Sequence, residues 1–335
     1  MNSDVLQVRD LQVRYHTARG PVKAVEHVNL SLREGERMGL VGESGSGKST
    51  LVMSILRLIK PPGFVEAGEI WMTGLNSPDY PAEPTSGDRV RINLLSLSTE
   101  EMRRIRLARI GLITQGSMNS LNPVARVEDQ LIDGMRAHGV RLSGREAKSK
   151  VSEFLGQVGL RPEVARMYPH ELSGGMKQRV CIAIAASLRP KVIIADEPTS
   201  ALDVVVQSRV IETLHRIQVT LNSSMILVGH DMGLMAQSVE RLAVMYAGRV
   251  VEVSPVTDIF ANPLHPYTRL LIASLPSFEH RGEFHGIPGL PPSLLEKMEG
   301  CPFHPRCPSV MDRCRSEEPI LRDVDSNREA ACHLL

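Results

Sequence analysis

A glycine-rich loop at residues 42–50 is the feature of this chain whose chemistry is clearest; it reads Gly-Glu-Ser-Gly-Ser-Gly-Lys-Ser-Thr. An apolar run at 38–41 precedes the loop, and apolar residues recur at helical spacing after it. Glycine lets backbone N–H groups close around an anion, and the positive end of the following helix faces the same point. We therefore expect a nucleoside triphosphate to bind Gly42, Ser44, Gly45, Ser46, Gly47, Lys48, Ser49 and Thr50.

Two carboxylates end a predicted strand, because Asp196 and Glu197 follow the apolar residues 192–195. Ligands of open α/β sheets bind at the carboxyl ends of the strands. With a phosphate loop in the same chain, we expect Asp196 and the Ser49 hydroxyl to hold Mg²⁺. We expect Lys48 to reach the β and γ phosphates, and Glu197 to orient or deprotonate the attacking water.

Two further polar residues also end predicted strands. His230 follows the apolar run 225–229, and Gln115 follows the strand predicted at 111–114. A single histidine usually has a structural role, but at the end of a core strand His230 could reach a γ-phosphate. Gln115 is a candidate site residue because it lies between the core and a helical block.

Composition excludes some classes of function. The chain has 335 residues, with 39 Lys and Arg against 38 Asp and Glu, so it lacks the basic excess of a protein that follows nucleic acid by charge. No stretch approaches the roughly 20 apolar residues that cross a bilayer. The first residues lack the basic and apolar regions of a secretory signal. We therefore expect a cytosolic protein that could dock onto a membrane through another subunit.

The apolar pattern predicts an α/β chain in which strands alternate with helices, and hence a mostly parallel sheet with right-handed crossovers. Pro61-Pro62 should end the first helix, and residues 76–88 should form a polar surface loop. The predicted strands are 5–15, 22–32, 38–41, 111–114, 192–196, 225–229, 242–246 and 249–253. The predicted helices are 51–59, 99–109, 127–138, 145–158, 176–188 and 204–221.

The chain is expected to divide into a nucleotide-binding domain at 1–255, with a helical subdomain at about 99–175, and a loop-rich extension at 256–335. Prolines are frequent in this extension, which also holds four of the five cysteines. Disulfides are disfavoured in the cytosol, and zinc sites favour cysteine pairs two to four residues apart, which these are not. A [4Fe–4S] cluster therefore fits better, while zinc shared with His304 or His333, and free thiols, stay open. The cluster ligands would be Cys301, Cys307, Cys314 and Cys332.

Together these motifs resemble the ATP-binding cassette (ABC) ATPases over residues 5–255. The resemblance implies a P-loop NTPase core with an antiparallel β subdomain and an inserted helical subdomain. It implies that Tyr15 stacks on adenine, that Gln115 is the Q-loop glutamine that senses Mg²⁺, and that His230 is the switch histidine. Leu172–Met176 resembles the signature motif, Asp196 and Glu197 the Walker B pair, and Ser200–Asp203 the D-loop, with Asp203 at its end.

The signature motif implies a partner. In this family Ser173, Gly174 and Gly175 cap an ATP that the opposite subunit holds, so that two shared sites form when two cassettes close. Hydrolysis of ATP then reopens the pair. The alternatives are a soluble cassette ATPase of DNA repair or translation, and an exporter. Repair proteins carry long coiled coils and translation proteins carry two cassettes, and this sequence has one phosphate loop and no such heptads.

A narrower resemblance is to the ATPase subunits of dipeptide and oligopeptide importers, a group that also includes nickel and oligosaccharide importers. Four segments carry it: 120–124, 168–171, 265–268 and 301–308. It implies a heterodimer with a paralogous ATPase, two membrane permease subunits, an external solute-binding protein and a place on the cytoplasmic face of the membrane. The chain departs from the group at Gly116-Ser117, where Asp-Pro or Glu-Pro is usual, and in the length of the 76–88 loop.

Overall fold

The computed structural model describes residues 4–74, 83–84, 90–200, 202–275, 286–295, 298–325 and 327–335. The chain divides into two units. The first comprises the residues up to Val5, Arg33–Glu36 and Leu97–Leu227, and the second comprises Leu6–Leu32, Arg37–Ser96 and Val228–Leu335. Apart from Glu83–Pro84, the loop predicted at 76–88 lies outside the described residues.

An antiparallel sheet in the second unit has the strand order β2-β1-β4-β6-β5. The strands predicted at 5–15 and 22–32 are confirmed as β1 (Asp4–Thr17) and β2 (Gly20–Arg33). The sequence did not predict β4 (Gly63–Thr73), β5 (Glu83–Pro84) or β6 (Val90–Asn93). Glutamates and glycines interrupt the apolar pattern of β4, so its alternation is weak.

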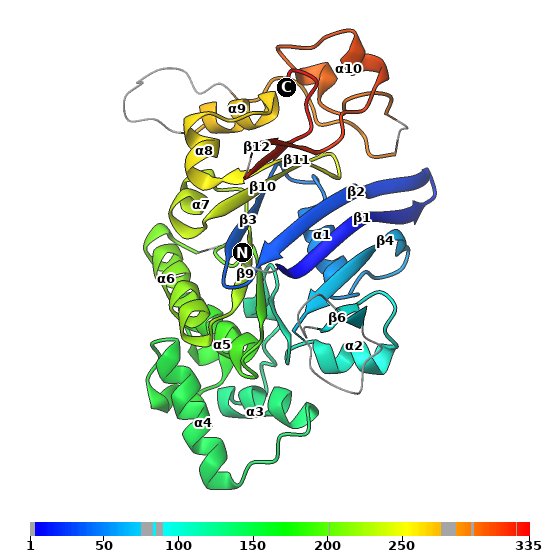
Figure 1. The fold of residues 1–335 in the computed structure, drawn as a ribbon. Helices are drawn as coiled ribbons and strands as arrows, with labels where there is room; N and C mark the ends of the chain where they lie inside the picture. The colour runs from blue at the N-terminus through cyan, green and yellow to red at the C-terminus, as the bar shows by residue number, and fades with distance from the viewer. Residues whose placement is uncertain are drawn as a thin grey trace. The chain divides into compact units, whose positions relative to one another are not determined.

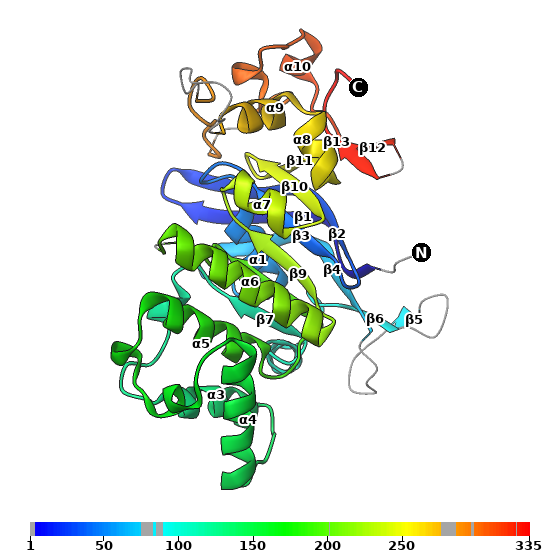
Figure 2. The same cartoon turned by 90° about the vertical axis from the view of Figure 1, so that its left-hand side faces the viewer.

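Five strands of an eight-stranded sheet belong to this unit, in the order β12-β13-β11-β10-β3. Strand β3 (Arg37–Val41), which leads into the phosphate loop, pairs in parallel with β10 (Arg241–Tyr246). Strand β10 pairs antiparallel with β11 (Arg249–Pro255), as expected for the two short strands near 242–253. Figure 2 shows β12 (Arg322–Asp325) and β13 (Arg328–Ala330) extending this sheet from the C-terminal end of the chain.

Helices of the second unit follow the phosphate loop and fill much of the C-terminal segment. Helix α1 (Lys48–Ile55) ends before residue 59, where the predicted helix ended, because Arg57 adopts a left-handed backbone with φ 50°. The C-terminal segment is less irregular than its prolines indicate, since Pro266 occupies the first turn of a helix, where no N–H is needed. Its helices are α8 (Val256–Ala261), α9 (Pro266–Ala273), the 3₁₀ turn η4 (His304–Arg306) and α10 (Arg313–Ser316); α7 (Met232–Ser238) precedes them.

The first unit contains the strands β7 (Ile110–Ile113), β8 (Val192–Asp196) and all but the last residue of β9 (Ser224–Val228). Strand β8 lies between the other two and pairs in parallel with β7. Helix α5 (Gly174–Ala186) contacts β7 and α6 (Val204–Leu221). The buried apolar residues of β8 and β9 therefore form the core of this unit.

A helical group in the first unit lies where the inserted helices were predicted (Figure 1). Helices α3 (Val127–Ala137) and α4 (Gly144–Gln157) contact each other and α5. Helix α2 (Thr99–Ile105) ends before the predicted residue 109, because Leu107 has a φ of 65°. The 3₁₀ turns of this unit are η1 (Ser117–Asn119), η2 (Pro162–Arg166) and η3 (Pro169–Glu171). Within the described parts of the chain, no helix is both long enough and apolar enough to cross a membrane.

Candidate functional site

The phosphate loop leaves β3 at Gly42 and enters α1 at Lys48. A Cβ atom on Gly42 would lie 2.1 Å from the carbonyl oxygen of Met245, and φ at Gly42 is +149°. Gly47, the residue before α1, has φ +102°, and a Cβ there would lie 2.4 Å from the carbonyl oxygen of Ala24. The neighbouring strands therefore leave no room for a side chain at either position, which is why the loop requires glycine.

The Lys48 side chain folds back onto this loop. Its Nζ donates to the carbonyl oxygens of Gly42 at 2.8 Å and Glu43 at 2.9 Å, and to the Ser46 hydroxyl at 3.3 Å. The residue is 7% exposed. A buried ammonium held by carbonyl groups at the start of a helix is a cation placed where a phosphate would bind.

Gly42 and Ser46 are buried like Lys48, and the other predicted ligands in this unit are exposed or half-buried. Ser44, Gly45 and Ser49 are exposed on the loop and the first turn of α1, and His230 is exposed just after β9. Tyr15 is half-buried near the end of β1, where its ring lies against Gly63 of β4. These positions leave each side chain accessible to a ligand.

The predicted catalytic carboxylates lie in the first unit. Asp196 is the buried last residue of β8, and Glu197 follows it with φ 46°, a left-handed conformation that a glutamate rarely adopts. Gln115, two residues after β7, donates from Nε2 to Glu197 Oε2 at 2.9 Å. Strained backbone of this kind concentrates at functional sites. The structure thus joins two residues that the sequence placed on separate strands.

The signature motif and the D-loop pack against each other. Ser173 is the N-cap of α5 and accepts from the Met176 N–H at 3.3 Å. Asp203 is the N-cap of α6 and accepts from the Val206 N–H at 3.0 Å. A Cβ atom on Gly175 would lie 2.6 Å from Val206 Cγ1, so this glycine lets the starts of the two helices approach. Gly174 is exposed beside it, and Ala201 of the D-loop is outside the described residues.

Ser117 of the unusual pair Gly116-Ser117 contacts α5. Gly116 has φ 66°, and the buried Ser117 hydroxyl donates to Gln178 Oε1 at 2.9 Å. The Cys181 thiol donates to the Ser117 carbonyl oxygen at 3.3 Å, and burial raises the pKa of Cys181 to about 11. Cys181 is thus a buried thiol within the core, as predicted. Sequence reasoning missed the contact of Ser117 with α5, because no local signal pairs residues 61 positions apart.

The four remaining cysteines gather in the C-terminal segment. The Cys301 N–H donates to the Cys314 carbonyl oxygen at 2.8 Å, and both side chains are buried. Burial, with a smaller effect of the other three thiols, raises the pKa of Cys301 to about 11. Cys307 and Cys332 are half-buried, and burial raises the pKa of each. All four are free thiols, but no group of three or more His, Cys, Asp or Glu in the described parts of the chain is arranged to hold a metal ion.

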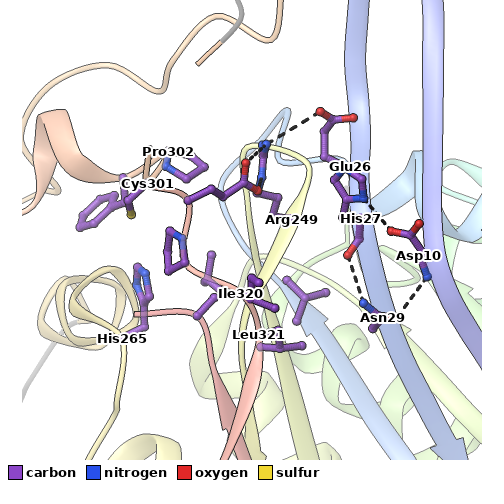
Figure 3. Close-up of a pocket in the computed structure, with 16 residues that line it drawn as sticks. Asp10, Glu26, His27, Asn29, Arg249, His265, Cys301, Pro302, Ile320 and Leu321 are labelled. Atoms are coloured by element: carbon purple, nitrogen blue, oxygen red, sulfur yellow. Dashed lines mark hydrogen bonds and ion pairs between the residues drawn. The ribbon is translucent and has the colours of Figure 1, made fainter. Parts of the chain in front are cut away.

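A cavity of about 460 Å³ also lies in the second unit, away from the predicted ligands of ATP (Figure 3). Val250, Ile320 and Leu321 contribute to its apolar lining. Polar side chains flank it: His27 Nδ1 lies 2.6 Å from Asp10 Oδ1, and Arg249 forms an ion pair with Glu318. The cavity lies between residues of the C-terminal segment and residues of β1 and β2.

Two protein families match parts of the chain. The family described as "ABC transporter" matches residues 25–200, and the one described as "Oligopeptide/dipeptide transporter, C-terminal region" matches residues 251–314. The first match contains the phosphate loop, the signature motif and both carboxylates. The second contains α8, α9 and three of the four clustered cysteines.

Curated relatives match over nearly the whole chain. The dipeptide transport ATP-binding protein DppD of Caldanaerobacter subterraneus subsp. tengcongensis is 40% identical over 99% of this chain and 97% of that protein. DppD of Escherichia coli strain K12 is 38% identical over 98% of this chain and 96% of its own length. The probable peptide ABC transporter ATP-binding protein y4tR of Sinorhizobium fredii is 40% identical over 98% of this chain and 94% of that protein.

Solved structures of cassettes have the same fold. The dimeric bacterial ABC transporter cassette MJ0796 matches with a TM-score of 0.62 at 27% identity, over 75% of this chain and 98% of that one. The cbiO1 protein of Clostridium perfringens, part of the complex cbiONQ, matches with a TM-score of 0.62 at 26% identity, over 78% of this chain and 92% of that one. The P-loop NTPase fold predicted from the motifs is therefore confirmed, and the chain belongs to the ABC transporter family as one of its ATP-hydrolysing subunits.

Proposed function

We propose that this chain is the ATPase of an importer that takes up dipeptides or oligopeptides. The similarity to dipeptide transport ATP-binding proteins over almost the full length, C-terminal segment included, carries the proposal. Uptake of nickel or oligosaccharides remains the alternative, because the same group of ATPases serves those importers. In the proposed role the phosphate loop and the carboxylates act on ATP, so they do not distinguish the cargoes.

We propose that Lys48, Ser49 and Asp196 hold the phosphates and Mg²⁺, and that Glu197 is the general base. The Lys48 ammonium donates to loop carbonyls at the start of α1, and phosphate oxygens would replace those carbonyls as its acceptors. The bound Mg²⁺ would neutralise charge on the transferred phosphoryl group. Glu197 would accept the proton of the attacking water, and His230 would contact the γ-phosphate.

Gln115 supports this assignment as a residue that orients the base. Its Nε2 donates to Glu197 Oε2 at 2.9 Å, and this hydrogen bond would fix the orientation of the carboxylate. The amide oxygen of Gln115 would be a ligand of Mg²⁺. Tyr15 would supply the aromatic face for adenine, since its ring is only half-buried.

We propose that two cassettes share the nucleotide sites, with Ser173, Gly174, Gly175 and Asp203 of one chain facing ATP held by the other. The exposure of Ser173, Gly174 and Asp203 supports this arrangement, and so does the dimeric cassette among the similar structures. The second cassette would be a paralogue in a heterodimer. Two permeases and a solute-binding protein would complete the importer, with this chain on the cytoplasmic face of the membrane.

We also propose the domain division at 1–255 and 256–335, with a helical subdomain at about 99–175. The separate family matches at 25–200 and 251–314 support a boundary near residue 255. The C-terminal strand β13 pairs with β11, so the extension adds a strand to a sheet of the nucleotide-binding domain.

A [4Fe–4S] cluster held by Cys301, Cys307, Cys314 and Cys332 is proposed as a structural cofactor of the extension. The four free thiols, from segments up to 31 residues apart, are near enough for each to raise the pKa of Cys301. Ligation would require the four side chains to rearrange, because in the described parts of the chain they are not arranged to hold a metal ion. Zinc, with His304 or His333, is the alternative.

Protein purified without oxygen should be brown and contain about four iron and four sulfide per chain. Elemental analysis and the visible absorption spectrum measure this. The matched control is Cys181→Ser, which should keep the iron, whereas Cys314→Ser should lose it. Colourless protein with one zinc per chain would contradict the cluster.

Glu197→Gln tests the proposed chemistry. The amide cannot accept a proton, so ATP turnover of the assembled pair should fall by about 1,000-fold while ATP still binds. Phosphate release and equilibrium nucleotide binding measure the two effects. Hydrolysis at the wild-type rate would remove Glu197 from the role of base.

A further inference from the structure

Arg306 joins the C-terminal segment to the phosphate loop. It ends the turn η4, between Cys301 and Cys307, and its side chain is 4% exposed. Its NH1 group donates to Glu43 Oε2 at 2.7 Å and its NH2 group to Glu43 Oε1 at 2.9 Å. Glu43 is the second residue of the phosphate loop. Two parallel hydrogen bonds between a guanidinium and a carboxylate form the geometrically most specific ion pair that proteins use.

The other donors of Arg306 are also satisfied. Nε donates to the Pro288 carbonyl oxygen at 2.8 Å, NH1 to the Tyr246 hydroxyl at 3.2 Å and NH2 to the Ile287 carbonyl oxygen at 3.3 Å. A guanidinium has five N–H donors, and each of them has an acceptor here. The hydrogen bonds to Glu43 raise the pKa of Arg306, so its charge is permanent. Only arginine can make this set of contacts, since the three donors of lysine diverge from one atom.

The backbone of Glu43 is held as well. Its N–H donates to the Tyr267 hydroxyl at 2.9 Å, and its carbonyl oxygen accepts from Lys48 Nζ at 2.9 Å. Tyr267 is a fully buried residue of α9. One residue of the phosphate loop is therefore held at its side chain by Arg306, at its N–H by Tyr267 and at its carbonyl group by the phosphate-binding lysine.

We propose that Arg306 is a positioning residue of the ATP site: through Glu43 it fixes the phosphate loop in the shape that binds phosphate, and it neutralises a carboxylate that would otherwise repel ATP. The C-terminal segment is then part of the nucleotide site. The inference rests on the proposed function in one respect, that the ligand of the loop is ATP. It does not depend on which solute is imported or on what the cysteines bind.

Equilibrium binding of Mg-ATP to the full-length chain tests the inference with Arg306→Gln, Glu43→Gln and the double variant. We expect each single variant to bind ATP about tenfold more weakly, and the double variant to be no weaker than Arg306→Gln. Arg315→Gln is the matched control, because Arg315 is an exposed arginine of the same segment; its affinity should equal that of the wild type.

Glu43→Gln separates positioning from charge. If Arg306 only neutralised Glu43, the amide would remove the repulsion, and ATP would bind as tightly as in the wild type or more tightly. That result would overturn the positioning role. Arg306→Lys keeps the charge but loses the paired hydrogen bonds, so it should bind about as weakly as Arg306→Gln, and wild-type affinity in this variant would also overturn the inference.

Tyr267→Phe covers the case in which the arginine variants do not fold. It removes one hydroxyl and frees the Glu43 N–H without disturbing the ion pair, and it should weaken ATP binding about threefold. Thermal melting of each variant shows whether it is folded. If the wild-type chain does not bind ATP, the proposed function is wrong. If the wild-type chain binds ATP but all of these variants bind it equally tightly, only this inference is wrong.

Discussion

Two helices of this chain begin at glycine-containing motifs that were both predicted to bind phosphate, and they are built differently. Helix α1 begins after Gly47, whose left-handed backbone the loop requires, and Lys48 lies buried among the loop carbonyls. Helix α5 begins after Ser173, which uses its own hydroxyl to cap the helix and remains exposed with Gly174.

The difference shows which motif can bind ATP by itself. The start of α1 has N–H groups and a cation placed to meet a phosphate. The start of α5 offers N–H groups and one hydroxyl on an exposed surface, and its glycine serves packing, since Gly175 makes room for Val206. It can therefore add to the binding of an anion that another chain already holds, but it is poorly equipped to recruit one.

Of the variants that test this difference between the two helix starts, Lys48→Ala should have the largest effect on ATP affinity. Without the ammonium, the separated subunit should bind Mg-ATP about 100-fold more weakly, because a buried charge that meets the phosphates is lost. Calorimetric titration measures the affinity. Ser173→Ala is the control at the other helix and should leave the affinity of the separated subunit unchanged. Equal losses in the two variants would mean that both helix starts bind nucleotide within one chain.

Gly175→Ala should act only on the assembled pair. The added Cβ, 2.6 Å from Val206 Cγ1, forces the start of α5 away from α6. ATP hydrolysis by the pair should fall about tenfold, while the separated subunit binds ATP normally. Val206→Ala in the same chain removes the clash and should restore most of the activity. Failure of this rescue, with both proteins folded, would indicate that Gly175 is needed for something other than packing.

The motifs that could be predicted from the sequence are local. The phosphate loop and the strand before it occupy 13 consecutive residues, 38–50, whose types are dictated by backbone geometry and burial. The start of α6 agrees with the helix predicted at 204–221, and Asp203 caps it, whereas α5 begins two residues before the helix predicted at 176–188, because Ser173 caps it. The end of α1 could not be predicted, since nothing in the sequence shows that Arg57 would adopt a left-handed backbone.

Contacts between distant residues could not be predicted. Arg306 and Glu43 are 263 positions apart, and Gln115 and Glu197 are 82 apart. Periodicity shows which face of an element is buried but not which polar residues from other elements meet it. The C-terminal prolines led to a prediction of irregular structure for a related reason. Proline disfavours the interior of a helix, but Pro266 lies in the first turn of α9, where proline is tolerated.

A third helix start, that of α9, provides a contrast, because the chain itself supplies the carboxylate there: Glu252 accepts from the Leu264 and His265 N–H groups at 2.9 Å. His265 is its N-cap, and Nδ1 accepts from the Tyr267 N–H at 3.0 Å. Burial lowers the pKa of His265 to about 3, with a smaller effect of Arg269, so the imidazole is neutral in the folded protein. A proton on Nδ1 would place two donors against each other and break the cap.

Acid should therefore destabilise this helix start in a defined range of pH. The pKa of His265 is about 3 in the folded chain and about 6.5 in the unfolded chain, so the unfolded chain takes up the proton first as the pH falls. The stabilising contribution of the neutral imidazole is complete above pH 6.5 and declines progressively towards pH 3, by about 1 kcal/mol between pH 7 and pH 5.5. Asparagine also caps helices but does not titrate, so His265→Asn should lose less stability over this range. Denaturant midpoints of both proteins at the two pH values measure the difference, and parallel losses would show that other groups govern the acid response.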